Sequence, residues 1–313
     1  MEVQIHQLRS FVAVAELRHF TQAAAHVGIS QPSLSKQIHS LETDLGAPLF
    51  ERVRGDIALT AAGDALLPLA QRILADVDTA RREVQELVGL RRGRVRLGAT
   101  PSLCASLVPR VLRRFRDAHP GIDLHIEESG SQDLVRNLTR GELDLALIVL
   151  PEQGTDPALR AEPVLREHLV VASVSPLAAT TSAGELHLTD LHDHPLVMFR
   201  TGYDLRDATL EACRRAGFTP SFAVEGGEMD AVLGLVEAGL GVALVPSVVL
   251  AGRPRLRATP LTPPGVQRTI ALAQRHEIVP SHAAQALRET LFADLRAAAG
   301  AGELPAGVEL ELR

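Results

Sequence analysis

The stretch HFTQAAAHVGISQPSLSKQIHSLETDLGAPLFERVR, residues 19–54, decides the fold of the first part of the chain. Apolar residues recur at helical spacing on both sides of Gly28, which predicts two helices joined by a tight turn. Glycine suits this turn because it adopts a left-handed backbone without steric cost. We expect Thr21 to cap the first helix and Ser30 the second, with Pro32 in a first turn where a missing N–H costs little.

The second of these helices has two chemically different faces. One face is apolar, and the other carries amide, hydroxyl and cationic groups. A helix with a packed back and such a polar front suits the major groove of DNA. On spacing alone, an ordinary helical hairpin with a solvated face is the more frequent explanation. The apolar face consists of Leu34, Ile38, Leu41 and Leu45, and the polar front of Gln31, Ser33, Ser35, Lys36, Gln37 and His39.

Composition indicates a soluble globular protein of two or three domains, with 313 residues of which 46% are hydrophobic and 22% charged. The net charge of −6 does not point to a nucleic-acid partner. Any affinity for DNA would therefore depend on a local arrangement of Lys36, Arg52 and Arg54. Arg52 and Arg54 flank a Gly55-Asp56 turn signal, which predicts a short hairpin.

Neither the cysteines nor the histidines form a recognisable reactive or metal-binding pattern. Cys104 and Cys213 lie far apart without CxxC spacing, which suits a reducing cytoplasm, and we interpret Cys104 as a small core residue. No secretion signal precedes the first helix, and the apolar run at 145–150 is too short for a membrane span. No nucleophile elbow or histidine metal motif is present. We therefore expect a cytoplasmic protein without catalytic residues, metal or cofactor.

Residues 60–89 change in character. Apolar positions alternate spacings of four and three, the heptad pattern of a seam between two helices. An amphipathic helix packed on its own domain is the alternative, but a helix of this length with a regular seam favours pairing with a second copy. The seam positions are Leu66, Ala70, Ile73, Val77, Ala80, Val84 and Leu87.

After a hinge near 90–93, predicted strands and helices alternate, which indicates βαβ units and a largely parallel sheet. A block near 151–165, rich in Pro, Glu and Gly, and the segment 247–267 are expected to cross between two α/β lobes that enclose a ligand cleft. The expected domains are a DNA-binding domain at 1–60, a linker helix at 61–90 and an effector domain at 91–300. Within the latter, lobe I is 91–163 with 267–300, lobe II is 164–266, and a poorly ordered tail follows at 301–313.

The segment FTQAAAHVGISQPSLSKQIHSLETDLGAPLFERVRGDIALTAAGDALL resembles the N-terminal signature of LysR-type transcriptional regulators, nearly continuously from Leu8 to Leu67. GRVRLGATPSL, LVPRVLRRFRDAHPGIDLHIEE, LVRNLTRGELDLALI and VLGLVEAGLGVALVP are similar to the regulatory part of that family. The resemblance implies a winged helix-turn-helix, a linker helix that pairs two subunits, and an effector domain folded like a type 2 periplasmic binding protein. It also implies a homodimer that assembles into a homotetramer on double-stranded DNA.

The resemblance also implies which residues approach DNA. They lie at the start of the second helix of the helix-turn-helix, at the start of the first, and in the wing. Lys36 stands where the family more often has arginine, so a phosphate contact is at least as well supported there as a guanine contact. The candidate DNA-binding residues are Thr21, Gln31, Pro32, Ser33, Ser35, Lys36, Gln37, Arg52 and Arg54.

Hydroxyl groups after the first two strands of the effector domain lie at predicted helix starts, which favour an anion, typically a carboxylate. Helix capping alone needs the same residue types, but the family resemblance favours a small organic effector here. Arg200 could neutralise an acidic effector or simply pair with Asp204 or Asp207. The candidate effector-binding residues are Thr100, Ser102, Ser129, Gly130, Ser131, Phe199, Arg200, Thr201, Tyr203 and Gly227.

The sequence thus predicts a DNA-binding regulator controlled by a small molecule that binds between two lobes. The alternative is a cytoplasmic solute-binding protein that does not bind DNA, for which the first ninety residues would have no purpose. An enzyme that uses the same cleft ranks third, because no catalytic group is recognisable.

Overall fold

A computed structural model describes residues 3–53, 56–87, 93–151, 154–178, 181–276 and 278–312. The chain divides into two compact units, one containing Met1–Leu90 and the other most of the chain from Arg91 onward. Within these ranges, no helix combines the length and the apolar character that crossing a membrane requires.

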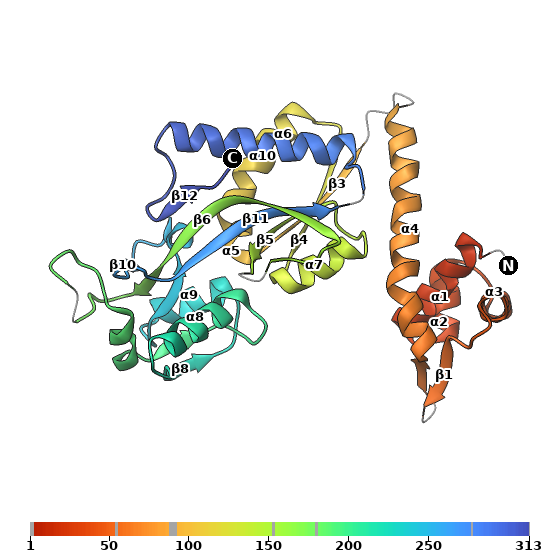
Figure 1. Cartoon of the computed structure of the whole chain (residues 1–313), viewed down its shortest axis with the longest axis horizontal. Helices are drawn as coiled ribbons and strands as arrows, with labels where there is room; N and C mark the ends of the chain where they lie inside the picture. Colours follow the sequence, from red (N-terminus) through yellow and green to blue (C-terminus); the bar gives the residue numbers. More distant parts are fainter. Residues whose placement is uncertain are drawn as a thin grey trace. The chain divides into compact units, whose positions relative to one another are not determined.

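The first unit is a three-helix cluster followed by a two-stranded wing and a long helix (Figure 1). The strands pair antiparallel, with Arg52 opposite Ile57. The helix ends agree closely with the spacing of apolar residues in the sequence. The elements are α1 (Ile5–Leu17), α2 (Phe20–Val27), α3 (Gln31–Leu45), β1 (Phe50–Val53), β2 (Asp56–Leu59) and α4 (Ala61–Leu87).

The core of this unit joins all three short helices. Phe11 of α1 is fully buried, and its ring centroid lies 5.4 Å from that of Phe50. The turn after α2 is made by Gly28 at φ +79°, as its position in the sequence predicts. The expected cap of α2 was wrong. His19, rather than Thr21, occupies the N-cap position and accepts a hydrogen bond from the backbone N–H of Gln22, because the helix begins at Phe20.

The long helix α4 packs one face on its own unit, which corrects part of the predicted seam. Ala70 is fully buried and Leu66 is partly buried in the core cluster of the first unit, so neither is free to contact another chain. The exposed apolar side chains of α4 are instead Leu69, Ile73 and Val84, which are 46%, 41% and 60% exposed. The exposed apolar stripe of α4, which includes Leu69, Ile73 and Val84, therefore does not include the predicted seam positions Leu66 and Ala70.

Lobe I of the second unit has a sheet covered on both faces. In Figure 1, α6 and α10 lie on one side of the sheet and α7 on the other. The helical segment after β3 is interrupted at Ser106, which is the C-cap of α5 and the N-cap of α6. The elements are β3 (Arg94–Ala99), α5 (Pro101–Ala105), α6 (Leu107–Ala118), β4 (Asp123–Glu128), α7 (Ser131–Thr139), β5 (Leu145–Leu150), β11 (Gln267–Arg275) and α10 (His282–Gly300).

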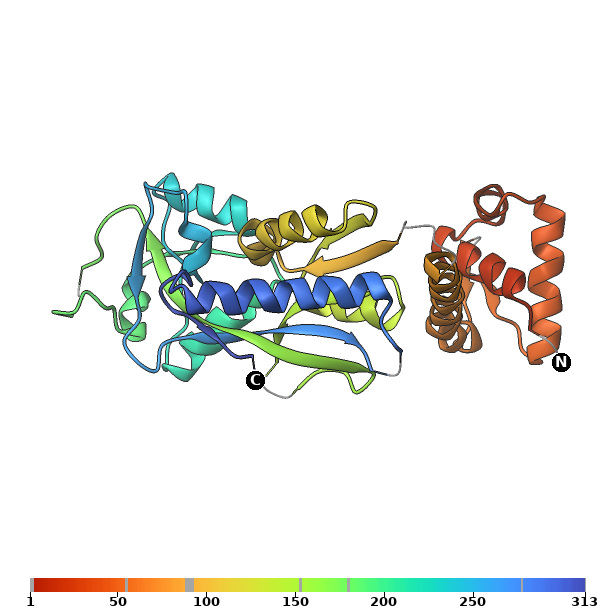
Figure 2. The same ribbon diagram turned by 90° about the horizontal axis from the view of Figure 1, so that it is seen from above.

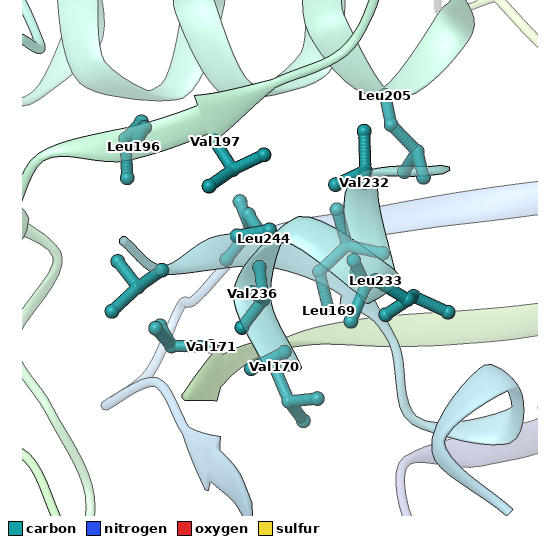
Figure 3. Packing of buried hydrophobic residues seen from close by; sticks show 14 of the residues in the cluster. Leu169, Val170, Val171, Leu196, Val197, Leu205, Val232, Leu233, Val236 and Leu244 are labelled. Atoms are coloured by element: carbon teal, nitrogen blue, oxygen red, sulfur yellow. The ribbon is translucent and has the colours of Figure 1, made fainter. Parts of the chain in front are cut away.

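Lobe II is smaller and has its own aliphatic core. Figure 3 shows side chains of β6 (Leu159–Ser173), β7, α8, α9 and β9 packed together, among them Leu169, Val197, Leu205, Val232 and Leu244. The elements after β6 are η1 (Leu188–Asp193), β7 (Leu196–Met198), α8 (Asp204–Arg215), β8 (Phe222–Glu225), α9 (Met229–Glu237), β9 (Ala243–Pro246), η2 (Ser247–Leu250) and β10 (Arg257–Pro260).

Two long antiparallel strands connect the lobes, which corrects the expected sheet. The strand β6 (Leu159–Ser173) pairs with β11 along its first part and with β9 and β10 along its second (Figure 2). Within the large sheet, only β3 pairs in parallel, with β4 and β5. The expectation of a largely parallel sheet was wrong, because the segments taken as loop crossings contain strands that return in the opposite direction.

The C-terminal tail is also ordered in part, contrary to expectation. The strand β12 (Val308–Leu310) pairs antiparallel with β6, with Glu309 opposite Arg166. The backbone N–H of Glu311 donates to the carbonyl of Val164 at 3.0 Å, and Arg166 forms an ion pair with Glu311. The tail is ordered because the edge of β6 offers backbone groups to which it can hydrogen-bond. The Gly- and Ala-rich composition of the tail gives no sign of this pairing.

Candidate DNA-binding surface and effector site

The start of α3 presents a preorganised polar surface. Ser30 caps the helix by accepting from the backbone N–H of Ser33, and Pro32 occupies its first turn. Gln31 donates from Nε2 to the hydroxyl of Ser35 at 3.0 Å, which fixes neighbouring groups one helical turn apart. Gln31, Pro32 and Ser33 are exposed, whereas Leu34 behind them is fully buried. The helix thus has the packed back and free polar front that the sequence predicts.

Lys36 is the only lysine of the chain, and its side chain is exposed on the same surface. It forms no ion pair within the described residues. Gln37 is less available, because its Oε1 accepts from Ser10 of α1. Thr21 is exposed near the start of α2. Arg52 lies in β1, where the structure describes its backbone but not its side chain. Arg54 lies outside the described residues.

The two lobes meet where helices α7 and α8 begin. The hydroxyl of Ser131 donates to Oδ2 of Asp204 at 2.7 Å, and its backbone N–H donates to the same oxygen at 3.2 Å. A Cβ on Gly130 would lie 3.3 Å from the carbonyl oxygen of Gly202, so the two loops approach closely. Of the predicted effector positions, Gly130 approaches Gly202 and Ser131 binds Asp204, a carboxylate that the candidate set did not contain.

A buried ion pair lies beside the first strand–helix turn of lobe I. Arg268 on β11 contacts Glu167 on β6 at 2.6 Å, and both residues are more than nine-tenths buried. The same guanidinium donates to the hydroxyl of Ser102 at 2.8 Å, and Thr100 lies next to it with only 3% of its surface exposed. Sequence reasoning missed this pair. Both strands carry several charged side chains, so no feature of the sequence singled out this pair.

An aromatic pair from lobe II faces this region. The rings of Phe199 and Tyr203 stack at 4.7 Å between centroids. Tyr203 is only 3% exposed, and its hydroxyl has no hydrogen-bond partner among the described residues. Burial raises the pKa of that hydroxyl, and Glu228, Asp204 and Glu128 raise it further, against the opposing charge of Arg268. The hydroxyl therefore stays protonated and within the electrostatic reach of three carboxylates.

Arg200 is engaged with a different carboxylate from those expected. Its Nε donates to Oε1 of Glu228 at 2.7 Å, rather than to Asp204 or Asp207. Its backbone N–H donates to the carbonyl of Gly227, which has φ +91° and so suits glycine. The carbonyl of Thr201 accepts a further bond from Arg200. Arg200 is thus fixed within lobe II and already neutralised.

The pKa of two carboxyl groups near the lobe contact is raised. Burial raises the pKa of Asp204, although hydrogen bonds from Ser131 and the charge of Arg268 lower it in part. Burial also raises the pKa of Glu128, and the charges of Glu228 and Asp230 add to that rise. Both shifts favour the protonated form of these carboxyl groups.

The thiols do not have the properties of reactive cysteines. Burial, reinforced by the charge of Glu128, raises the pKa of Cys104 to about 12. Burial raises the pKa of Cys213 to about 11. Because the thiolate is the reactive form, both are poorly suited to redox chemistry at neutral pH. Among the described residues, no group of histidine, cysteine and carboxylate side chains is arranged to hold a metal ion.

The chain combines a winged helix-turn-helix with a two-lobed α/β domain, and because a fold by itself does not fix function, the class of protein follows from the family comparisons. Residues 5–64 match the family model described as the bacterial regulatory helix-turn-helix protein of the lysR family. Residues 89–296 match the model of the LysR substrate binding domain. The chain belongs to the LysR family of transcriptional regulators, and it is a DNA-binding regulator with a substrate-binding effector domain.

Relatives and solved structures span nearly the whole chain. The transcriptional dual regulator GltC of Bacillus subtilis is 32% identical over 284 residues, covering 89% of this chain and 94% of the relative. A probable hydrogen peroxide-inducible genes activator of Streptomyces viridosporus is 36% identical over 275 residues, covering 86% and 87%. A full-length OxyR variant from Pseudomonas aeruginosa covers 95% of both chains, with a TM-score of 0.70 and 27% identity. Full-length CbnR in complex with its target DNA has a TM-score of 0.64 and 25% identity, covering 92% and 98%.

Proposed function

We propose that this regulator contacts operator DNA through the exposed start of α3, with the wing alongside. The proposal is carried by the polar front of α3, where Lys36 is exposed and has no ion pair within the described residues, among amide and hydroxyl groups that lie above a buried apolar back. Such a helix can enter a major groove without losing its packing. The proposed contacts are Thr21, Gln31, Pro32, Ser33, Ser35, Lys36, Arg52 and Arg54, with Gln37 acting through the nitrogen of its amide.

The single lysine permits a direct test of this surface. An amine-reactive acylating reagent can modify only Lys36 and the N-terminal amine, so both are read in one mass spectrum. DNA from upstream of the protein's own gene should protect Lys36 and leave the N-terminal amine reactive. Equal modification with and without bound DNA would contradict the proposal.

Substitution tests what the lysine contacts. If Lys36 binds a phosphate, Lys36→Ala should weaken all sites alike and lower the salt dependence of binding by about one unit. Fluorescence anisotropy across a salt series measures both quantities. Arg116→Ala is the matched control, because it removes an exposed cation from the second unit. A loss of preference between operator and unrelated DNA would instead identify a base contact.

Dimerisation is assigned to the free stripe of α4, followed by assembly into a homotetramer. A single DNA-binding domain with few cations binds DNA weakly. When two such domains are joined in a dimer, binding of the first to the operator raises the effective concentration of the second. The stripe consists of Leu69, Ile73, Val77, Ala80 and Val84, at spacings of four, four, three and four. Leu87 continues the predicted seam but its side chain is outside the description.

The effector is a small organic molecule that binds between the lobes, and it changes DNA binding by favouring one arrangement of the assembly. Supporting residues come from the helix starts on both lobes, in particular Ser129, Ser131 and Tyr203, with Thr100 and Ser102 beneath them. Because the family consists of transcriptional regulators, we assign no enzymatic reaction to this region. A regulator of this kind acts on the chromosome, so we place it in the cytoplasm.

A further inference from the structure

The C-terminal tail folds back onto the point where β6 passes from lobe I to lobe II. The helix α10 ends at Gly300, and the backbone N–H groups of Gly302 and Glu303 close it by donating to carbonyls of its last turn. Further on, the tail reaches β6, where His168 is the last residue that pairs with β11 and Leu169 the first that pairs with β9. The match to the effector domain ends at residue 296, so the family comparison does not account for the tail.

Lobe I holds the tail through both backbone and side chains. The sequence VELEL at 308–312 alternates apolar and acidic residues, as a strand with one buried face does. Its apolar side chains pack against the core of lobe I. Arg166 lies 3.9 Å from Glu309 and forms a second ion pair with Glu311. The tail is therefore attached to lobe I by strand pairing, apolar burial and charge.

The two residues before this strand connect the tail to the crossing point of β6 and to lobe II. The carbonyl of Gly307, which has φ +80°, accepts the backbone N–H of His168 at 2.7 Å. The preceding carbonyl, that of Ala306, accepts the hydroxyl of Ser247 at 2.6 Å. Ser247 begins η2, and Val249 of η2 is buried in the core of lobe II. Consecutive residues of the tail thus contact lobe II, the crossing point and lobe I.

We propose that residues 306–312 act as a clasp that restrains bending between the two lobes. Two-lobed domains change their lobe angle at a few residues of the connecting strands, and an attachment that spans the same point resists this change. Bending here would also move Glu167, which pairs with Val308 and holds Arg268 against Ser102. The clasp goes beyond the proposed function, because it acts on lobe motion whether or not an effector is bound.

The clasp is built so that it can open without unfolding the lobes. Its ion pairs are partly exposed, and such pairs contribute little to stability because solvent screens them. The apolar side chains of 308–312 are only partly buried. Short terminal segments with these properties open locally at a small cost in free energy.

The test measures amide hydrogen exchange at single residues in the full-length protein and in a chain shortened by residues 304–313. The reporter is Ser131, whose backbone N–H donates to Asp204 across the lobes. If the lobes bend more often without the clasp, this N–H loses its partner more often. Its exchange should then rise about fivefold, as expected from the loss of one neutral hydrogen bond. Increased exchange at His168 alone would show that the tail only covers an edge, and would overturn the proposal.

Ser247→Ala separates the clasp from simple strand pairing. It removes the contact of the tail with lobe II and leaves β12 paired with β6. His168 should therefore stay protected, while exchange at Ser131 still rises. Thr290→Ala removes a hydroxyl-to-carbonyl bond of the same kind from within α10 and should change neither residue. Unchanged exchange at Ser131 in Ser247→Ala would contradict the clasp, and neither DNA nor effector enters the measurement.

Discussion

At the scale of single residues, the candidate effector site contains both a charge that is neutralised by an ion pair and a carboxylate that has no ion pair among the described residues. Arg268 and Glu167 neutralise each other in a buried position and hold Ser102 in place. Asp204 is different, because it is largely enclosed and carries a charge that only hydrogen bonds from Ser131 and a nearby arginine offset. A residue kept in this state costs stability and is typical of a functional position.

Asp204→Asn should therefore raise the thermal midpoint of the protein at neutral pH. The folded-state pKa of Asp204 lies above its ordinary value of 3.8 because of burial, so ionised Asp204 costs stability above that pKa. As the pH falls below the folded-state pKa, the folded carboxyl becomes protonated and the advantage of the variant shrinks, and it vanishes only below the ordinary value of 3.8, where the unfolded state is protonated too. Thermal unfolding at pH 8 and in steps toward pH 4 measures this. A variant that is less stable throughout would show that the Ser131 bonds outweigh burial.

At the scale of elements, the helix α4 has one side buried in the core of its own unit and another side exposed. The buried side of α4 completes the core of the first unit through Ala70, while Leu69, Ile73 and Val84 remain exposed on the isolated chain. Exposed aliphatic side chains at heptad-like spacing indicate a partner helix.

Ile73→Asp should disrupt the dimer and raise its dissociation constant roughly a hundredfold, because a carboxylate would be buried in an apolar seam. Sedimentation velocity over a concentration series gives the constant. Arg72→Asp introduces the same side chain at the adjacent exposed position and should leave the dimer intact. If both variants behave alike, another surface joins the subunits.

At the scale of the whole molecule, the weak charge of each DNA-binding domain makes assembly necessary for affinity. A chain with net charge −6 is not attracted to DNA as a whole, so paired heads must supply the binding energy. The order of domains makes this possible, because the helix that follows the wing also carries the dimer stripe.

The full-length protein should accordingly bind a DNA duplex with two half-sites at least a hundredfold more tightly than one with a single half-site, within the usual range of avidity. Ile73→Asp should lose most of this difference while retaining the affinity for one half-site. Anisotropy with the two duplexes at one salt concentration provides the comparison. Equal affinities in the wild-type protein would mean that each head binds alone.

Local sequence determined the elements of this protein. The turn at Gly28, the cap at Ser30 and the surface of α3 follow from periodicity, capping and turn chemistry, which act over a few residues. The length and order of the N-terminal motif likewise pointed to the LysR family before any fold was known.

Tertiary structure decided which residues of distant elements contact one another. The pairing of Arg268 with Glu167 joins residues 101 positions apart, and Asp204 reaches Ser131 across 73. The buried face of α4 and the pairing of β12 with β6 also depend on surfaces formed elsewhere in the chain. Periodicity shows that a side chain will be buried or exposed, but not which distant group will satisfy its charge or hydrogen bonds. That partner exists only once the chain has folded, and here it turns an expected carboxylate site into one already filled by the protein.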